Sequence, residues 1–90
     1  MIIHRAEFLI NTKLDDDTLE FWITEEWLLP QQEQNETVFS EADIARARLI
    51  RELIDDMGVN TEGVGVALNL LDQIHSLRKA VADHLKLNRK

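Results

Sequence analysis

The side chains that could do chemistry in this 90-residue chain are mainly carboxylates and three histidines. Carboxylates bind cations or transfer protons, and histidine transfers protons near neutral pH or binds metals. His75 and His84 are separated by about 900° of helix rotation, so they face opposite sides of a helix and cannot share a metal. Asp15-Asp16-Asp17 is more typical of a helix start than of a cation site. With no cysteine and no phosphate-binding or nucleophile motif, we predict no enzyme, metal site or cofactor.

The charge of the chain is acidic and unevenly distributed. Seventeen Asp and Glu against ten Lys and Arg give a net charge of −7, which disfavours general binding to nucleic acid. Residues 1–30 carry −5, residues 31–60 carry −4 and residues 61–90 carry +2. Such asymmetry indicates either a surface for a basic partner or a solvated acidic face. No apolar run approaches the ~18 residues of a membrane span, and we expect a soluble, cytoplasmic protein that does not enter the membrane.

Because only three glycines and one proline interrupt the whole sequence, we predict a mainly helical chain. Residues 1–60 are expected to form its first domain. A first helix over residues 5–11 would bury Ala6, Leu9 and Ile10. Asp15 is a good N-cap for a second helix that ends near residue 25 or 26. The spacing of its apolar residues predicts one buried stripe, made of Leu19, Trp22 and Ile23.

Between residues 27 and 39 the pattern predicts a small β-ribbon, with extended pieces at 27–30 and 37–39 around a polar loop. Ser40 and Asp43 then resemble a capping box, with Asp in the place that Glu or Gln usually takes. A third helix should run from there to Met57, and Gly58 is suited to end it. Its predicted apolar stripe consists of Ile44, Ala47, Ile50, Leu53, Ile54 and Met57.

Residues 61–90 are expected to form one long C-terminal helix, capped by Asn60 and reaching about Leu87. Its apolar residues recur at alternating steps of three and four, which suits either packing within the chain or pairing with a second copy. We predict that the distal half makes a homodimer contact, because so small a domain has little surface to cover it. The dimerisation residues would be Leu70, Ile74, Leu77, Val81 and Leu85.

This order of elements resembles a MerR-type winged helix-turn-helix with a small β-ribbon wing and a long C-terminal helix. Trp27-Leu28-Leu29-Pro30 is similar to the start of that family's wing, and Phe39-Ser40-Glu41-Ala42-Asp43-Ile44 with Arg46 is similar to its end. One branch is more closely matched, the chaperone modulators of the CbpM type. The segment that carries this resemblance reads Gly63-Val64-Gly65-Val66-Ala67-Leu68-Asn69-Leu70-Leu71-Asp72-Gln73-Ile74.

Two residues depart from the MerR-type pattern. Lys13 stands where the helix-turn-helix turn usually has glycine, and Glu26 stands where the start of the wing usually has it. A left-handed backbone at a residue with a Cβ atom costs roughly 1 kcal/mol. The two departures therefore count against the family's turn geometry and against a sharp helix-turn-helix over residues 5–25.

The second helix lacks the basic side chains that read DNA in a helix-turn-helix. From Asp15 to Glu25 it carries five acids and no base, and Glu20 stands where DNA-binding members typically carry Arg. Acids in the major groove would be repelled by the phosphates. On the third helix, Arg46, Arg48 and Arg51 would either form ion pairs within the helix or contact phosphate. Glu52 and Asp55 lie four residues beyond Arg48 and Arg51.

The resemblance implies a non-enzymatic adaptor that binds the J-domain of a DnaJ-like co-chaperone and limits its action on Hsp70. An acidic surface would suit the basic helix that J-domains present. The alternative is a MerR-like DNA-binding transcriptional regulator. Phe21 lies off the apolar stripe and is either an exposed anchor or a residue packed beneath the ribbon. The predicted partner-binding residues are Asp15, Asp16, Asp17, Glu20 and Phe21, with Asp55 and Asp56 as a second group.

Overall fold

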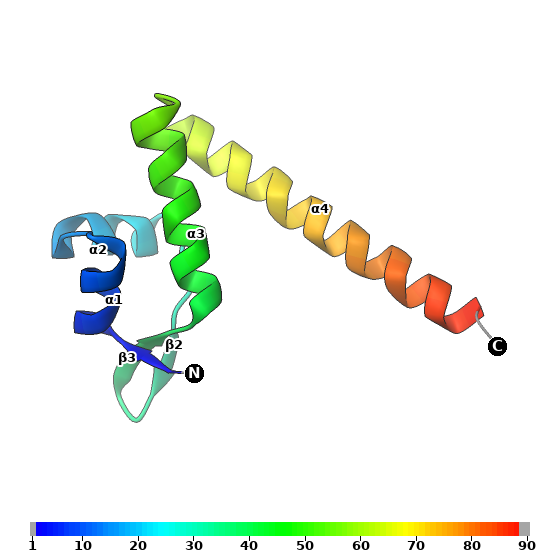
Figure 1. The fold of residues 1–90 in the computed structure, drawn as a ribbon, viewed down its shortest axis with the longest axis horizontal. Coiled ribbons are helices and arrows are strands. Elements are labelled where there is room, and N and C mark those ends of the chain that lie inside the picture. Colours follow the sequence, from blue (N-terminus) through cyan, green and yellow to red (C-terminus); the bar gives the residue numbers. More distant parts are fainter. Residues whose placement is uncertain (1, 89–90) are drawn as a thin grey trace. The chain divides into compact units, whose positions relative to one another are not determined.

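The computed structural model describes residues 2–88, and the chain divides into two compact units, Met1–Asn60 and Thr61–Lys90. The first unit contains three helices and a three-stranded sheet (Figure 1). The second is one long helix. In chain order the elements are β1 (Ile3–His4), α1 (Arg5–Thr12), α2 (Asp16–Thr24), β2 (Gln31–Glu33), β3 (Glu36–Phe39), α3 (Glu41–Arg51), the π-helical turn η1 (Glu52–Asp56) and α4 (Thr61–Asn88).

The core of the first unit forms where α1 meets the sheet and α3. The rings of Phe8 and Phe39 stack with their centroids 4.1 Å apart, which joins α1 to β3. Burial of such side chains is the main stabilising term for a domain of this size. The fully buried or nearly buried apolar residues of this unit are Ile3, Phe8, Leu19, Trp22, Trp27, Leu28, Val38, Phe39, Ala47 and Ile50.

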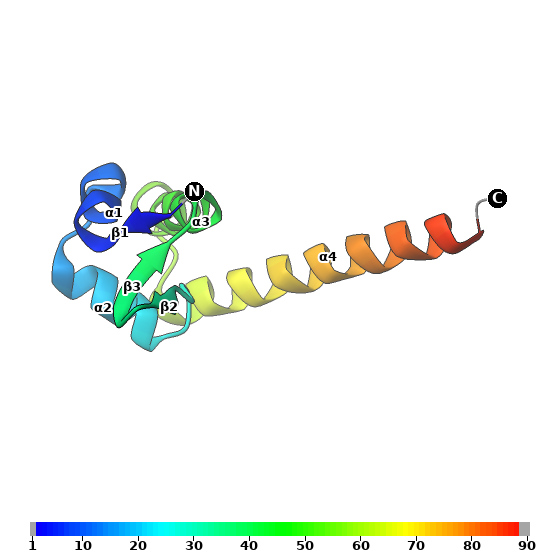
Figure 2. The same cartoon turned by 90° about the horizontal axis from the view of Figure 1, so that it is seen from below.

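The sheet differs from the predicted two-stranded ribbon. Its antiparallel strands are ordered β1-β3-β2, so the N-terminal residues Ile3 and His4 add a third strand beside β3 (Figure 2). The strand before the turn is Gln31–Glu33 and not the predicted 27–30. Gln34 and Asn35 both have positive φ, and two such residues make the tight hairpin turn that matches strand twist. The predicted polar loop is therefore mostly strand.

Helix α1 turns a different face inward than its predicted stripe. Phe8 and Thr12 are buried and Leu9 is half-buried, whereas Ala6 is exposed and Ile10 is 78% exposed. The stacking of Phe8 on Phe39 selects this face, and the Thr12 hydroxyl donates a 2.7 Å hydrogen bond to the carbonyl of Phe8. The buried hydroxyl is thereby satisfied within its own helix.

Helix α3 begins at the predicted capping box, but it is followed by a π-helical turn that the sequence does not indicate. Ser40 and Asp43 form the reciprocal capping box, with the Ser40 amide donating to Asp43 at 2.9 Å and the Asp43 amide donating to Ser40 at 3.3 Å. The last turn widens into the π-helical η1, in which the Met57 amide donates to the Glu52 carbonyl. Met57 is 71% exposed, which contradicts its place in the predicted buried stripe, since the wider turn rotates it outward. Gly58 follows with φ +67°, as a helix-ending glycine should.

The second unit is the single helix α4, about 42 Å long at the usual helical rise. It reaches Asn88, close to the predicted end at Leu87, while Arg89 and Lys90 lie outside the described residues. Every described side chain from Asn69 to Lys86 is exposed. Within residues 2–88 no helix is both long and apolar enough to cross a membrane.

Candidate partner-binding surface

Helix α2 separates its residues cleanly into a buried and an exposed face. Leu19 and Trp22 are buried and Ile23 is half-buried, which confirms the predicted stripe. On the outer side all five predicted partner-binding residues of this helix are exposed. They are Asp15, Asp16, Asp17, Glu20 and Phe21.

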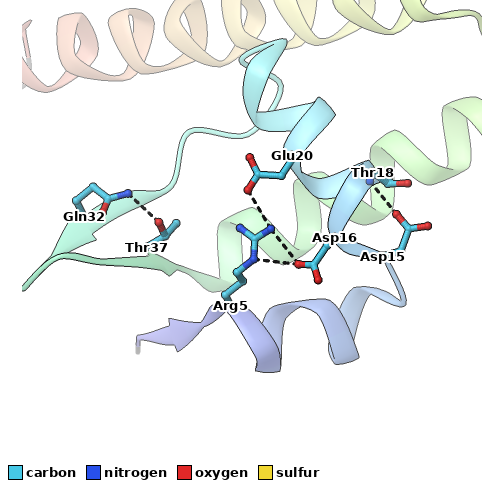
Figure 3. Close-up of polar contacts among 7 residues, drawn as sticks. All are labelled: Arg5, Asp15, Asp16, Thr18, Glu20, Gln32 and Thr37. Carbon is cyan, nitrogen blue, oxygen red and sulfur yellow. Dashed lines mark hydrogen bonds and ion pairs between the residues drawn. The ribbon is translucent and has the colours of Figure 1, made fainter.

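The start of α2 is fixed by Asp15, the predicted N-cap. Its carboxylate accepts a hydrogen bond from the Thr18 amide at 2.7 Å (Figure 3). The backbone amide and then the side chain of Thr18 lower the pKa of Asp15 below its ordinary value of 3.8. Asp16 and Asp17 follow in the first turn, where the helix dipole favours negative charge.

Both ends of α2 are bounded by left-handed backbone, so the family's turns are kept although neither residue is glycine. Lys13, in the turn before the helix, has φ 59° and ψ 33°. Glu26, in the turn after it, has φ 61°. The chain then folds back sharply, because the Trp27 amide donates a 2.9 Å hydrogen bond to the Trp22 carbonyl. The two left-handed turns set the direction of α2 relative to α1 and to the sheet.

Two of the predicted acids are engaged by a residue that sequence reasoning did not single out. The Arg5 guanidinium donates to Asp16 through Nε at 3.1 Å and Nη2 at 3.0 Å, and its Nη2 lies 3.0 Å from Glu20 Oε1 (Figure 3). Asp16 and Glu20 are one helical turn apart, so both carboxylates face Arg5 at the start of α1. The signal for this contact is the scarcity of bases, because residues 1–30 contain only Arg5 and Lys13 against seven acids.

Phe21 is a partly exposed aromatic side chain beside the acids. It is 44% exposed, and its ring meets the buried Trp27 edge to face with the centroids 5.7 Å apart. The Trp27 indole therefore contacts the Phe21 ring, and part of the Phe21 side chain remains accessible to solvent. Phe21 thus packs against Trp27 and still presents apolar surface, and its role as an anchor for a partner stays a prediction.

The arginines of α3 serve the fold in different ways. Arg51 forms the predicted ion pair with Asp55 at 3.5 Å, and its Nη1 also donates to the Thr12 carbonyl at 2.7 Å, which closes the end of α1. Arg46 Nε donates to the Trp27 carbonyl. Arg48 is the exposed member of the three.

Asp55 and Asp56 lie exposed in η1, and Asp55 shares a hollow with Asp15. This hollow, of about 310 Å³, has Leu14, Trp22 and Ile54 among its apolar lining residues. One member of each predicted acidic group therefore reaches the same depression between the α1–α2 turn and the end of α3. Lys13 and Arg51 also line it, so its charges are mixed.

The five predicted dimerisation residues form one exposed stripe on α4. At 100° per residue they fall within about 80° of helix circumference. Their exposed fractions are 53% for Leu70, 48% for Ile74, 64% for Leu77, 53% for Val81 and 60% for Leu85. Among residues 2–88, no cluster of three or more His, Asp or Glu side chains is arranged to hold a metal.

The helix pair α1–α2, the β-ribbon wing and the long C-terminal helix together define a winged helix-turn-helix protein. The family described as MerR HTH family regulatory protein matches residues 3–86. The chain therefore belongs to the MerR helix-turn-helix family. No curated protein and no solved structure matches the chain significantly.

Proposed function

We propose that this protein is a non-enzymatic cytoplasmic adaptor of the CbpM type, which binds the J-domain of a DnaJ-like co-chaperone and limits its action on Hsp70. The observation that carries the proposal is the outer face of α2. In a DNA-reading helix-turn-helix this helix enters the major groove and contacts bases and phosphates. Here Asp16, Asp17 and Glu20 are exposed on it.

Charge is the first reason to assign this face to a protein partner. Affinity for DNA comes largely from neutralised phosphates, and three exposed carboxylates would add repulsion at the closest approach. Arg5 contacts two of these acids, and its donors are directed at Asp16 and Glu20. A basic helix, such as the one that J-domains present to Hsp70, has the complementary charge and would associate quickly and in a salt-sensitive way.

Phe21 supplies the apolar contact that an acidic face alone lacks. Aromatic side chains held in place before binding lose little conformational entropy in an interface. The edge-to-face contact with Trp27 holds Phe21 in this way. Asp55 and Asp56, exposed at the end of α3, extend the acidic character of the first unit and are proposed as secondary contacts.

The apolar stripe on α4 supports self-association as a homodimer. Five large apolar side chains, each about half or more exposed, recur at coiled-coil spacing along one side of the helix. A second copy of the same helix buries this stripe without requiring any additional partner. Two adaptor units in one particle would present two acidic faces.

A MerR-like DNA-binding regulator is the second candidate, because the matched family is described as a helix-turn-helix regulatory protein. The arginines of α3 give it little further support. Arg51 and Arg46 donate to the carbonyls of Thr12 and Trp27, within the domain. Arg48 is left as the exposed cation of that helix.

Binding of the isolated J-domain tests the proposal. The isolated J-domain of a DnaJ-like co-chaperone is immobilised, and capture of the wild-type chain is compared with capture of Asp17→Lys and of Asp83→Lys. Asp17 lies on the α2 face, whereas Asp83 is an exposed acid of α4, so both variants change the net charge equally. Capture should fall with rising salt and should fall much further for Asp17→Lys than for Asp83→Lys. Absence of capture, together with retardation of the protein's own promoter fragment at physiological salt, would favour the DNA-binding alternative.

A further inference from the structure

Arg5 occupies the surface that we assign to the partner. Its guanidinium contacts both Asp16 and Glu20 at 3.0 Å, and a second donor reaches Asp16 at 3.1 Å (Figure 3). The planar fork of a guanidinium suits two carboxylates on one helix face better than an ammonium does. These two acids thus already hold a cation of the kind that a basic helix would bring.

We propose that Arg5 is an intramolecular competitor for the α2 face and sets its selectivity. A cation of the partner gains full contact with Asp16 and Glu20 only when it displaces the Arg5 guanidinium. This inference rests on the proposed function, in which the α2 face receives a basic protein helix. It adds that Arg5 lowers the affinity for every basic partner and favours partners with several closely spaced bases.

The exposure of the three side chains makes the exchange feasible. Asp16 is 70% exposed and Glu20 is 61% exposed, so a partner's cation can approach both carboxylates from solvent. The Arg5 side chain is 33% exposed and lies against the protein. Exposed ion pairs contribute little net free energy, so displacement of Arg5 costs only a small part of the affinity. Asp17, exposed beside this pair, attracts the approaching partner during the exchange.

A purely structural role for Arg5 makes the opposite prediction. If Arg5 only fastens α1 to α2, its removal loosens the α2 face, and binding of the partner weakens. If Arg5 competes, removal frees two carboxylates, and binding strengthens even when the melting temperature falls slightly. The sign of the change in affinity therefore separates the two roles.

The test compares Arg5→Gln with Arg48→Gln in the full chain, by calorimetric titration with the isolated J-domain and with an oligolysine peptide. Arg48 is an exposed arginine of α3, so both variants lose one positive charge. Arg5→Gln should bind about two- to fivefold more tightly than wild type, and Arg48→Gln should differ by less than about 1.5-fold. Arg5→Lys, which keeps the charge without the fork, should fall between wild type and Arg5→Gln.

A further variant examines the competition itself. Glu20→Gln should weaken binding more in the Arg5→Gln background than in the wild-type chain, because only there is Glu20 free for the partner. Unchanged or weaker binding by Arg5→Gln, or an equal gain with Arg48→Gln, would overturn the inference. If no variant binds the J-domain, the proposed function fails, and the same comparison with oligolysine then decides whether Arg5 competes.

Discussion

The two strained turns around α2 predict that glycine at either position stabilises the protein. Lys13 and Glu26 have φ of 59° and 61°, in the left-handed region. That conformation costs a residue with a Cβ atom about 1–2 kcal/mol, whereas glycine adds about 0.5–1 kcal/mol of entropy to the unfolded chain. The difference leaves Lys13→Gly and Glu26→Gly each about 0.5–1 kcal/mol more stable than wild type.

Thermal unfolding at one fixed protein concentration measures this gain. For a domain of this size, 0.5–1 kcal/mol corresponds to a rise in melting temperature of about 3–6 °C. Lys13→Ala is the matched control, because it removes the same side chain and keeps the strain, so its melting temperature should not rise. Gly58→Ala should lower stability by about 1 kcal/mol, since φ there is +67° and an added Cβ meets nothing within 4 Å. Equal melting temperatures for Lys13→Gly and Lys13→Ala would refute the argument.

Three further predictions concern a charge, a cap and the α4 stripe. The lowered pKa of Asp15 means that its charged form stabilises the fold above the ordinary value of 3.8 and that this contribution is lost as pH falls through the lowered pKa. Melting temperatures measured from neutral pH down to about pH 3 should therefore fall more steeply for wild type than for Asp15→Asn, which keeps the cap without the charge; parallel profiles would contradict this. Ser40→Ala should cost about 1 kcal/mol in denaturant unfolding, because it removes the side-chain half of the capping box, and an unchanged midpoint would disprove that role. In light scattering, the wild-type protein should have twice the 10.4 kDa mass of the chain, and Leu77→Glu should be monomeric. Lys79→Glu, on the opposite side of α4, is the control and should remain dimeric. A monomeric wild type would rule out the stripe as a dimer contact.

Local signals along the chain predicted much of the fold. Asp15 and the Ser40–Asp43 pair act within three residues of themselves, so a capping pattern in the sequence is enough to place the helix starts. Gly58 ends its helix region for a similarly local reason. The positive φ values at Lys13 and Glu26 go against a local signal of the same kind, because both positions keep the family's turn although neither residue is glycine.

Long-range contacts decided the features that were missed or wrong. The inward face of α1 depends on Phe8 meeting Phe39, a residue 31 positions away, so helical spacing alone chose the wrong stripe. The third strand requires Ile3 to pair with Phe39, which no local pattern indicates. Arg5 reaches Asp16 across 11 residues, and only the packing of α1 near α2 makes that contact possible.

The candidate site was therefore predicted by residue type more fully than by geometry. The exposed acids of α2 were identified from composition, because the segment from Asp15 to Glu25 contains five acids and no base. Their engagement by Arg5, and the hollow that Asp15 and Asp55 share, depend on tertiary structure. Asp16 and Glu20, which contact Arg5 of α1, are also two of the acids in the proposed surface.

In the proposed function, the outer face of α2 binds the basic helix of a J-domain. The most direct measurement is a titration of the isotope-labelled chain with the unlabelled J-domain, followed by the backbone amide signals in NMR spectra. We predict that the perturbed amides concentrate on α2, at Asp16, Asp17, Glu20 and Phe21, and that higher salt reduces the shifts. Shifts confined to α4 or to the wing, or spectra unchanged by the J-domain, would contradict the claim.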